Sequence, residues 1–283
     1  MGEPRAVGNQ MVLMLDGREA GTVAYLAGGR PVGVESEEEV GVSLSEIRRR
    51  SALEVEPFVV QVGVLRAVTG WIDETLAHHH ARREFELRQG HGDKTVVRHA
   101  HVGLLTEVGF PLLDRRSSGQ AFLKLKVQPE RITVERKSTP RRNAPPVVPL
   151  SGSSFRFSID GVLDGTEVQR VEAFSIKVGT KKRYIGEATL PQFDPTRMEL
   201  PSFTVHLPGT QSKRLKAWSD DTLAQGGSAK TSRTGQLELF ARGGTRAMTL
   251  ELADLSITSV AGAGGAITRA VVHCGQMSMG ALQ

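Results

Sequence analysis

The side chains with the most chemical potential in this chain are histidines, which gather in two short stretches. One is the triplet from His78 to His80, and the other is the pair His99 and His101. Alternate residues of a β-strand share a face, so the pair has a spacing at which two imidazoles can chelate a metal ion. No carboxylate or cysteine falls at a recognisable zinc spacing nearby. We therefore interpret these histidines as surface residues and expect no metal ion.

Two pairs of neighbouring carboxylates could act as a general acid and base. Asp73 and Glu74 lie in one stretch whose apolar residues have helical spacing, and Asp220 and Asp221 lie in another. Acidic side chains in the first turn of a helix are stabilised by the helix dipole or act as caps. We expect both pairs in the first turns of their helices, with that structural role and no chemistry.

Other catalytic templates do not occur in the sequence. Nothing resembles a Walker loop, a nucleophile elbow, or a G-x-G-x-x-G segment that follows a strand. The glycine-rich run from Gly262 to Gly265 precedes a predicted strand and is interpreted as a loop. We predict that the protein is not an enzyme and has no catalytic residues and no cofactor.

The two helical stretches are near copies of each other. WIDETLA at Trp71 to Ala77 recurs as WSDDTLA at Trp218 to Ala224, and these two tryptophans, 218 − 71 = 147 residues apart, are the only ones in the chain. Small changes in spacing between other matching segments are those expected when loops between equivalent strands change length. The sequence therefore predicts an internal duplication. The other matching segments keep the same order, beginning at Met11 and Phe155, Pro57 and Pro201, Arg83 and Gly235, and Leu105 and Leu252.

A length of 283 residues suits two domains, since one domain usually has about 100 to 200 residues. Several prolines between Pro140 and Pro149, followed by Ser-Gly-Ser, indicate a semi-stiff, extended linker. We expect a first domain at 1–136, a linker at 137–152 and a second domain at 153–283.

The periodicity in each half is mainly that of β-strands with one apolar face. Gly243 and Gly244 can adopt the positive φ of a tight hairpin. Around the tryptophans the spacing becomes helical. Each half is thus predicted to be mainly β, with several antiparallel strands and one helix between an earlier and a later group. The alternating residues include Phe155, Phe157, Ile159, Phe203, Val205 and Leu207, and the helical ones include Leu65, Val68, Ile72, Leu76, Leu215 and Leu223.

The net charge of +5 and the pI near 9.5 invite a nucleic-acid interpretation. The basic residues are scattered, however, and include Lys181 and Lys182 in a predicted turn, while aromatic residues make up only 5% of the chain. Direct sequence-specific binding of nucleic acid is therefore disfavoured.

No apolar run of about 18 residues and no signal-peptide pattern is present, so we expect no membrane insertion and assembly in the cytoplasm. The single cysteine, Cys274, lies in an apolar run and is predicted to be a buried strand residue.

The layout of each half resembles the tail-tube proteins of contractile-tail phages and their relatives in contractile injection systems and the type VI secretion tube. An opening strand ends in a D-G turn, at Asp16-Gly17 and at Asp160-Gly161, and a helix with a tryptophan follows. In the first half an alternating strand pair comes next, from Arg83 to Val102, and then a closing segment from Leu105 to Ile132.

The resemblance implies small β-barrels or sandwiches with a flanking helix, six of which close into a ring around a channel. Three copies of a duplicated chain supply six domains, so the expected assembly is a homotrimeric ring with pseudo-sixfold symmetry, as in trimeric baseplate hubs. The expected partners are other copies of the chain, adjacent tube rings, and baseplate or spike proteins. A cargo, a tape-measure protein or DNA would occupy the channel.

The first half contains a charged insertion, residues 35–56, which the second half lacks in that form. The resemblance implies a hairpin or loop that reaches the adjacent ring, and a solvated loop with a short helix is the alternative. A hub, a tube subunit and an adaptor all remain open. Two other functions also remain: a two-domain β-sandwich binding module that forms no ring, and a histidine-dependent metalloenzyme.

Overall fold

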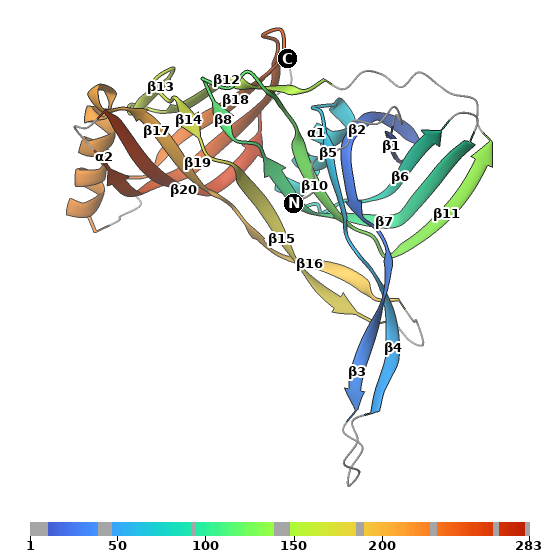
Figure 1. Ribbon diagram of the computed structural model, residues 1–283. Coiled ribbons are helices and arrows are strands. Elements are labelled where there is room, and N and C mark those ends of the chain that lie inside the picture. Colours follow the sequence, from blue (N-terminus) through green and yellow to red (C-terminus); the bar gives the residue numbers. More distant parts are fainter. Residues whose placement is uncertain are drawn as a thin grey trace.

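Figure 1 shows two β-rich units side by side, with two hairpins projecting below them. The structure is a computed structural model, and most of the residues it describes are in β-strands. It describes residues 11–38, 47–91, 94–138, 148–184, 190–226, 231–262 and 266–280.

The first half forms a closed barrel of six strands. Neighbouring strands follow the order β10–β5–β2–β1–β6–β7, and pairing of β10 with β7 closes the circle. Closure leaves no free edge along the paired length of these strands. The strands are β1 (Met11–Leu15), β2 (Arg18–Gly28), β5 (Phe58–Val62), β6 (Arg82–His91), β7 (Lys94–Phe110) and β10 (Leu123–Gln128), and β11 (Arg131–Ser138) pairs with the first part of β7.

The second half is a curled half-barrel. The counterpart of β2 is broken here into two short strands, β13 (Leu163–Gly165) and β14 (Arg170–Val171), which lie at opposite ends of the second half's own row of strands. That row runs β13–β12–β18–β19–β20–β17–β14. Its other strands are β12 (Leu150–Ile159), β17 (Ser202–Pro208), β18 (Arg233–Ala241), β19 (Arg246–Ala261) and β20 (Ile267–Met279), with a short 3₁₀ helix, η1 (Gly209–Gln211), after β17.

Two α-helices flank the sheets, α1 (Arg66–Leu76) after β5 and α2 (Lys213–Ala224) after η1. Trp71 and Trp218 are buried, and each indole N–H donates a hydrogen bond of 2.8 Å to a backbone carbonyl, that of Ala81 or Thr231. The prediction of a mainly β chain with two tandem barrel or sandwich units, each with one flanking helix, is confirmed.

Both helices begin five residues before their tryptophans, at Arg66 and Lys213, so neither has an acidic residue in its first turn. The prediction that Asp73 with Glu74 and Asp220 with Asp221 lie in first turns is wrong, because these pairs fall in the later turns of the helices. The apolar period starts further upstream than the tryptophan, since buried Val68 and Leu215 lie three residues before it.

Strand registers align the halves more accurately than the sequence match does. Leu13 faces Leu87 across β1 and β6, while Phe157 faces Leu237 across β12 and β18. Because Leu13 and Phe157 occupy the same place before their D-G turns, Leu237 corresponds to Leu87. The sequence match had aligned it with Phe85, which is two residues away, because the loop after the helix differs in length between the halves.

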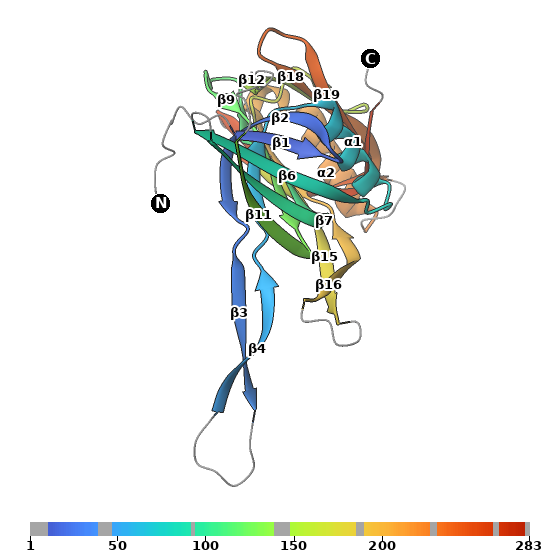
Figure 2. The same cartoon turned by 90° about the vertical axis from the view of Figure 1, so that its right-hand side faces the viewer.

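Two hairpins project from the same side of the molecule (Figures 1 and 2). One consists of β3 (Pro31–Glu38) and β4 (Ile47–Val55), which form a separate two-stranded sheet. The insertion at 35–56 is therefore a hairpin over its described residues, and the alternative of a short helix is wrong there. Residues 39–46 lie outside the described part of the chain.

The other hairpin consists of β15 (Phe174–Arg183) and β16 (Gln192–Glu199). Lys181 and Lys182 pair with residues of β16, so the prediction that they lie in a turn is wrong. This part of β15 is solvent-exposed on both faces and has no apolar alternation to mark it as a strand.

Other local predictions can be compared directly. Gly243 and Gly244 have φ values of 113° and 84° in the β18–β19 hairpin, and Cys274 is fully buried in β20, as predicted. Within the expected linker at 137–152, β11 extends to Ser138 and β12 begins at Leu150, while residues 139–147 lie outside the description.

Candidate functional site: the junction between the halves

A strand from the second half completes the sheet of the first. The first residues of β15 pair antiparallel with the end of β7, with Phe174 opposite Phe110 and Lys177 opposite Glu107. On this edge of β7, β6 extends only as far as Leu104. β15 therefore occupies the stretch that β6 leaves open, and the halves share one sheet.

Aromatic rings reinforce this pairing. The rings of Phe110 and Phe174 stack with centroids 4.6 Å apart, and Phe174 meets Phe203 edge-on at 4.8 Å. Phe203 in turn lies 5.3 Å from Phe157 in the core of the second half. Aromatic pairs contribute about 0.5–1.5 kcal/mol each beyond the burial of their area. The junction is thus anchored by a row of rings that begins in the first half and ends deep in the second.

The first half in turn contacts the second half through the segment between β7 and β10. Within it, β8 (Leu113–Asp114) pairs with β14, and β9 (Gln120–Ala121) pairs with β12. The corresponding connection in the second half, from Ala261 to Ile267, is shorter. Each half thus adds strands to the sheet of the other: β15 pairs with β7, and β8 and β9 pair with β14 and β12. The second half has only a short connection in place of the segment that carries β8 and β9.

Arg115 of this segment lies at the break between β13 and β14. Its Nε donates to the carbonyl of Val168 at 2.8 Å, and its Nη2 donates to those of Phe155 at 3.1 Å and Gly165 at 3.3 Å. The guanidinium also lies 4.9 Å from the centre of the Phe155 ring. A first-half side chain thus donates to three second-half carbonyls around the point where the strand is interrupted.

The helix α1 also takes part in the junction, because it lies against β20 of the second half. Both helices bury the face that carries the tryptophan, but only α1 buries a second stripe. Leu223, which the helical spacing placed on the apolar face of α2, is 77% exposed, so that prediction is wrong. Leu223 occupies the position in α2 that buried Leu76 occupies in α1, but no element among the described residues of the second half covers it. The second stripe is Thr69, Ile72 and Leu76 in α1, and its counterparts in α2 are Lys216, Ser219 and Leu223.

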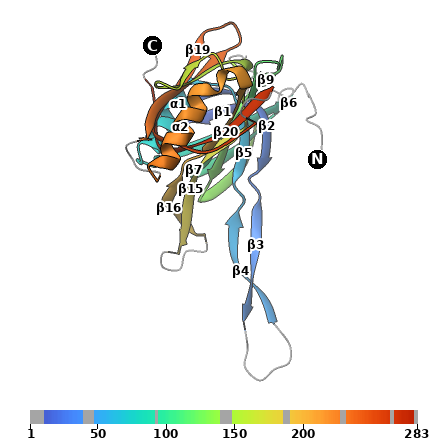
Figure 3. The ribbon, with the colours of Figure 1, turned by 90° about the vertical axis from the view of Figure 1, so that its left-hand side faces the viewer.

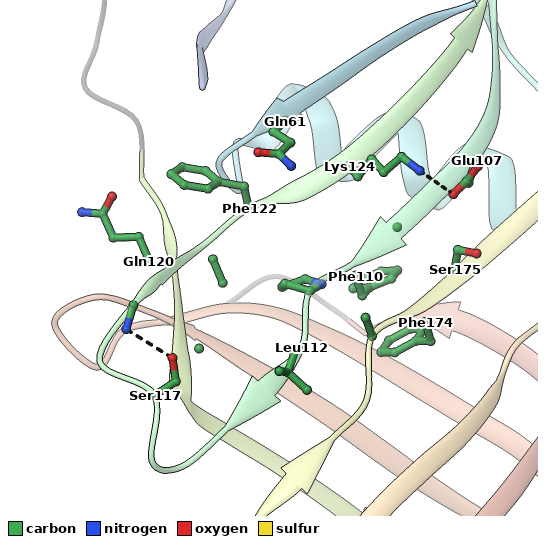
Figure 4. Close-up of a pocket in the computed structure, with 16 residues that line it drawn as sticks. Gln61, Glu107, Phe110, Leu112, Ser117, Gln120, Phe122, Lys124, Phe174 and Ser175 are labelled. Carbon is green, nitrogen blue, oxygen red and sulfur yellow. Dashed lines mark hydrogen bonds and ion pairs between the residues drawn. The ribbon is translucent and has the colours of Figure 1, made fainter. Parts of the chain in front are cut away.

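A cavity of about 650 Å³ opens where the end of β7, the segment after it and the start of β15 meet (Figure 4). Phe110 and Phe174 form part of its wall. Lys124 and Glu107 form an ion pair of 3.1 Å at its edge. Besides these rings and this ion pair, the lining includes the polar side chains of Gln61, Ser117, Gln120 and Ser175.

Charged contacts fix the hairpins relative to the barrel. Arg82 on β6 donates to the carbonyl of Phe193 at 2.8 Å and to Asp194 at 3.2 Å, both on β16. Lys182 of β15 forms an ion pair with Glu54 of β4, so the two hairpins also touch. Exposed ion pairs are worth about 0–1 kcal/mol, so these contacts orient the hairpins and add little stability.

The histidine triplet terminates α1. The backbone N–H of His78 donates to Thr75 and that of His79 donates to Glu74, while His78 and His80 adopt φ values of 60° and 44°. Burial, and then the nearby His78, lower the pKa of His80. The triplet is the left-handed exit from the helix, a conformation that the second half reaches with Gly226 at φ 61°.

His99 and His101 share one face of β7, as predicted, and their rings stack 6.0 Å apart. Nδ1 of His99 lies 3.1 Å from Glu86, and Nδ1 of His101 lies 3.2 Å from Glu84. Within the described ranges, no three His, Cys, Asp or Glu residues are placed so that they could hold a metal ion. The two histidines belong to a polar ladder across β6 and β7.

No protein-family model matches this chain, and no curated protein matches it significantly in sequence. No helix in the described part of the chain is both long enough and apolar enough to cross a membrane. The geometry of the junction is therefore the feature of the molecule that bears on its function.

Sequence reasoning missed the elements that make the junction. Arg115 stands in the run DRRSSG, which has the composition of a solvent-exposed loop. One signal could have found it: residues 111–122 separate two strands whose counterparts in the second half are joined by a short connection.

Proposed function

We propose that this protein is a structural subunit of a contractile tail or injection machine, in which three copies form a pseudo-sixfold ring around a channel. The observation that carries the proposal is the exchange of strands between the halves. β15 fills an open edge of the first half, and β8 and β9 extend the sheet of the second. Each unit is completed by a neighbour of similar fold.

Contacts of this kind are head-to-tail, since different surfaces of two similar units meet. Repetition of a head-to-tail contact gives a closed ring when the rotation closes, and a filament when it does not. With two units in each chain, a six-unit ring requires three chains. Ring closure would also pair strand edges that are otherwise open to aggregation.

The proposed surroundings follow from the positions of the hairpins. Both project from the same side of the two units (Figures 2 and 3), where they are available to an adjacent ring or to a baseplate or spike protein. The channel would take a cargo, a tape-measure protein or DNA. Assembly would take place in the cytoplasm of the producing cell, as part of a tail-like particle.

Native mass spectrometry and negative-stain microscopy over a wide concentration range test the proposal. We expect a species of three chains and annular particles with threefold or pseudo-sixfold symmetry. A compact monomer that persists at the highest concentration would count heavily against it.

A second candidate is a two-domain binding module that forms no ring, and the cavity at the junction favours it. It predicts a monomer whose melting temperature rises with a small ligand. The rise should be lost in the Lys124→Ala variant, because Lys124 lines the cavity.

A further inference from the structure

We propose that two copies of this chain join through one defined pair of surfaces, which reproduces the junction inside the chain. The proposal rests on the ring proposed above and goes beyond it by naming the residues in contact. It also makes the contact between copies the weaker of the two junctions. The leading surface consists of Lys216, Ser219 and Leu223 of α2, residues 259–262 at and just after the end of β19, and Ile267. The trailing surface consists of Tyr25 of β2, residues 29–32, which lead from β2 into β3, and Val134 of β11.

The leading surface follows from the correspondence between β7 and β19. The stretch of β7 that binds β15 is Glu107–Phe110. The strand registers place Ser259–Gly262 at the same position in the second half. By the same registers Leu252 corresponds to Ala100, although the sequence match paired it with Leu105. The facing residues that fix this alignment are Val60, Leu125 and Val108 in the first half and Val205, Ala270 and Val260 in the second.

That stretch of β19 has an open edge. β18 pairs with β19 only as far as Leu255, and β20 covers the opposite edge. No strand in the described part of the chain pairs with β19 beyond Leu255 on the β18 side. In the first half, the same position is where β15 binds.

The trailing surface follows in the same way from β15. Leu26 faces Val60 in the first half, and Val171 faces Val205 in the second, so Gly29–Val32 corresponds to Phe174–Lys177. Phe174–Lys177 is the stretch that pairs with β7. On the outer edge of Gly29–Val32 no strand of the described residues is paired, because β3 pairs only with β4.

Exposed apolar side chains gather on these two surfaces. Of the eight large hydrophobic residues that are exposed in the described part of the chain, five belong to them. Leu223 is the most exposed at 77%, whereas its counterpart Leu76 is 5% exposed in α1, which lies against β20. The five are Tyr25, Val32, Val134, Leu223 and Ile267, and Val134 lies on β11, the strand that corresponds to the end of β20.

The contact between copies lacks the features that anchor the junction inside the chain. Phe110 and Phe174, which stack there, are replaced by Gly262 and Gly29 in the corresponding positions. The short connection after β19 also offers no counterpart of Arg115. The contact between two copies is therefore expected to be less stable than the junction within one chain.

Pro31 weakens the strand pairing further. The carbonyl of Arg30 accepts a hydrogen bond from the N–H of Glu56, so it points toward the β4 side of the hairpin. On a strand, the backbone N and C=O groups of the next residue point to the opposite side, which here is the open edge. Pro31 therefore turns its nitrogen toward the open edge, where it has no N–H to donate. Its neighbour Val32 then sits opposite Ser259 at a position without ladder hydrogen bonds, where facing side chains are closest.

Substitution on α2 tests the leading surface. We expect Leu223→Asp to weaken association between copies by about tenfold or more, because a carboxylate would be taken out of water without a partner. The residue is 77% exposed, so the monomer should keep its stability. Tyr184→Asp, at an exposed site just after the end of β15, is the matched control and should leave association unchanged. Equal association of the wild type and Leu223→Asp by mass photometry would overturn the proposed role of α2.

A disulfide bond between Val32→Cys and Ser259→Cys in one double variant tests the register. The native Cys274 should not interfere, because burial raises the pKa of its thiol to about 11. Mild oxidation should give covalent dimers and trimers, and the control pair Tyr184→Cys with Ser259→Cys should give none. Ring particles without cross-links from the first pair would refute this interface and leave the proposed function standing. Absence of any assembly, in the wild type as well, would refute both.

Discussion

The helices α1 and α2 have similar sequences and different surroundings. α1 buries six residues, whereas α2 buries three. Three buried positions are common to both helices and form the face that contains the tryptophan. The three additional buried residues of α1 form the second stripe, which contains Leu76. The helix sequence thus determines that a helix forms and packs on its own sheet, whereas the neighbouring unit determines how much more of it becomes buried.

The same contrast extends to the strands around the helices. The first half keeps β2 as one strand of 11 residues and carries the segment with Arg115 between β7 and β10. The second half has the broken strand, β13 and β14, and a short connection at the corresponding place. The second half, in which this strand is interrupted, is therefore the half that binds the Arg115 segment of the first. The two halves differ in complementary ways at the junction that joins them.

The largest expected effect tests what the helices share. Trp71→Ala and Trp218→Ala should each lower the free energy of unfolding by about 3–5 kcal/mol, because each removes a buried ring and a donor to a backbone carbonyl. Denaturant unfolding monitored by circular dichroism measures both. A cost above 3 kcal/mol for one variant and near zero for the other would show that the two tryptophans are not equivalent anchors.

The second prediction tests what the helices do not share. Leu76→Ala should cost about 2–5 kcal/mol, as expected for a buried leucine. Leu223→Ala should change the stability of the monomer by less than about 0.5 kcal/mol, because the side chain is 77% exposed. Each variant is the other's control, since both replace the same residue in the same turn of corresponding helices. Similar losses at low protein concentration would contradict the difference in burial.

The third prediction concerns the strand break that distinguishes the second half. Arg115→Met should cost about 1–2 kcal/mol, because three carbonyls lose their donor while water still reaches the partly exposed site. The neighbouring Arg116→Met, also exposed, is the control and should be close to neutral. A loss equal to that of the control would mean that the break does not depend on Arg115.

Elements were easier to predict from the sequence than their partners were. The spacing around Trp71 and Trp218 required a helix, and the D-G turn, in which Asp16 and Gly17 have φ values of 50° and 74°, required a hairpin. The alternation of Phe174 and Ile176 marks a strand, but nothing in that alternation says that it pairs with β7. The partner of a strand is determined by contacts between residues that are far apart in the sequence, so a local sequence pattern does not predict it.

The junction was hidden for the same reason. Leu76 and Leu223 occur in the same motif, so the sequence assigns them the same environment, and only the position of the second unit separates them. Arg115 has the composition of its loop and gives no local signal of its three carbonyl partners. The duplication could be recognised from the sequence, whereas the asymmetry between its two copies required the structure.

The smallest expected effect concerns the acidic residues near the ends of the two helices. A carboxylate close to a helix C-terminus is disfavoured by the helix dipole unless a cation balances it. Glu74 has such a cation, because Nη2 of Arg83 donates to both of its carboxylate oxygens at 2.7 Å, and Arg83 also contacts Asp16 in the β1–β2 turn. Burial alone would lower the pKa of Arg83, but the hydrogen bonds to Glu74 and Asp16 outweigh it and raise that pKa. Asp221, at the corresponding place in α2, forms no ion pair with any other described residue.

These surroundings predict opposite signs for two conservative substitutions. Glu74→Gln should lower the free energy of unfolding by about 0.5–1 kcal/mol, because it weakens a partly exposed ion pair that ties α1 to β6. Asp221→Asn should raise it by about 0.3 kcal/mol, because it removes a negative charge from the last turn of α2, where no described residue forms an ion pair with it. Both changes should shrink as salt is added, since the charges are accessible to solvent. Thermal unfolding at low and high ionic strength measures the two signs, and a stabilising Glu74→Gln would show that the Arg83 contact does not distinguish α1 from α2.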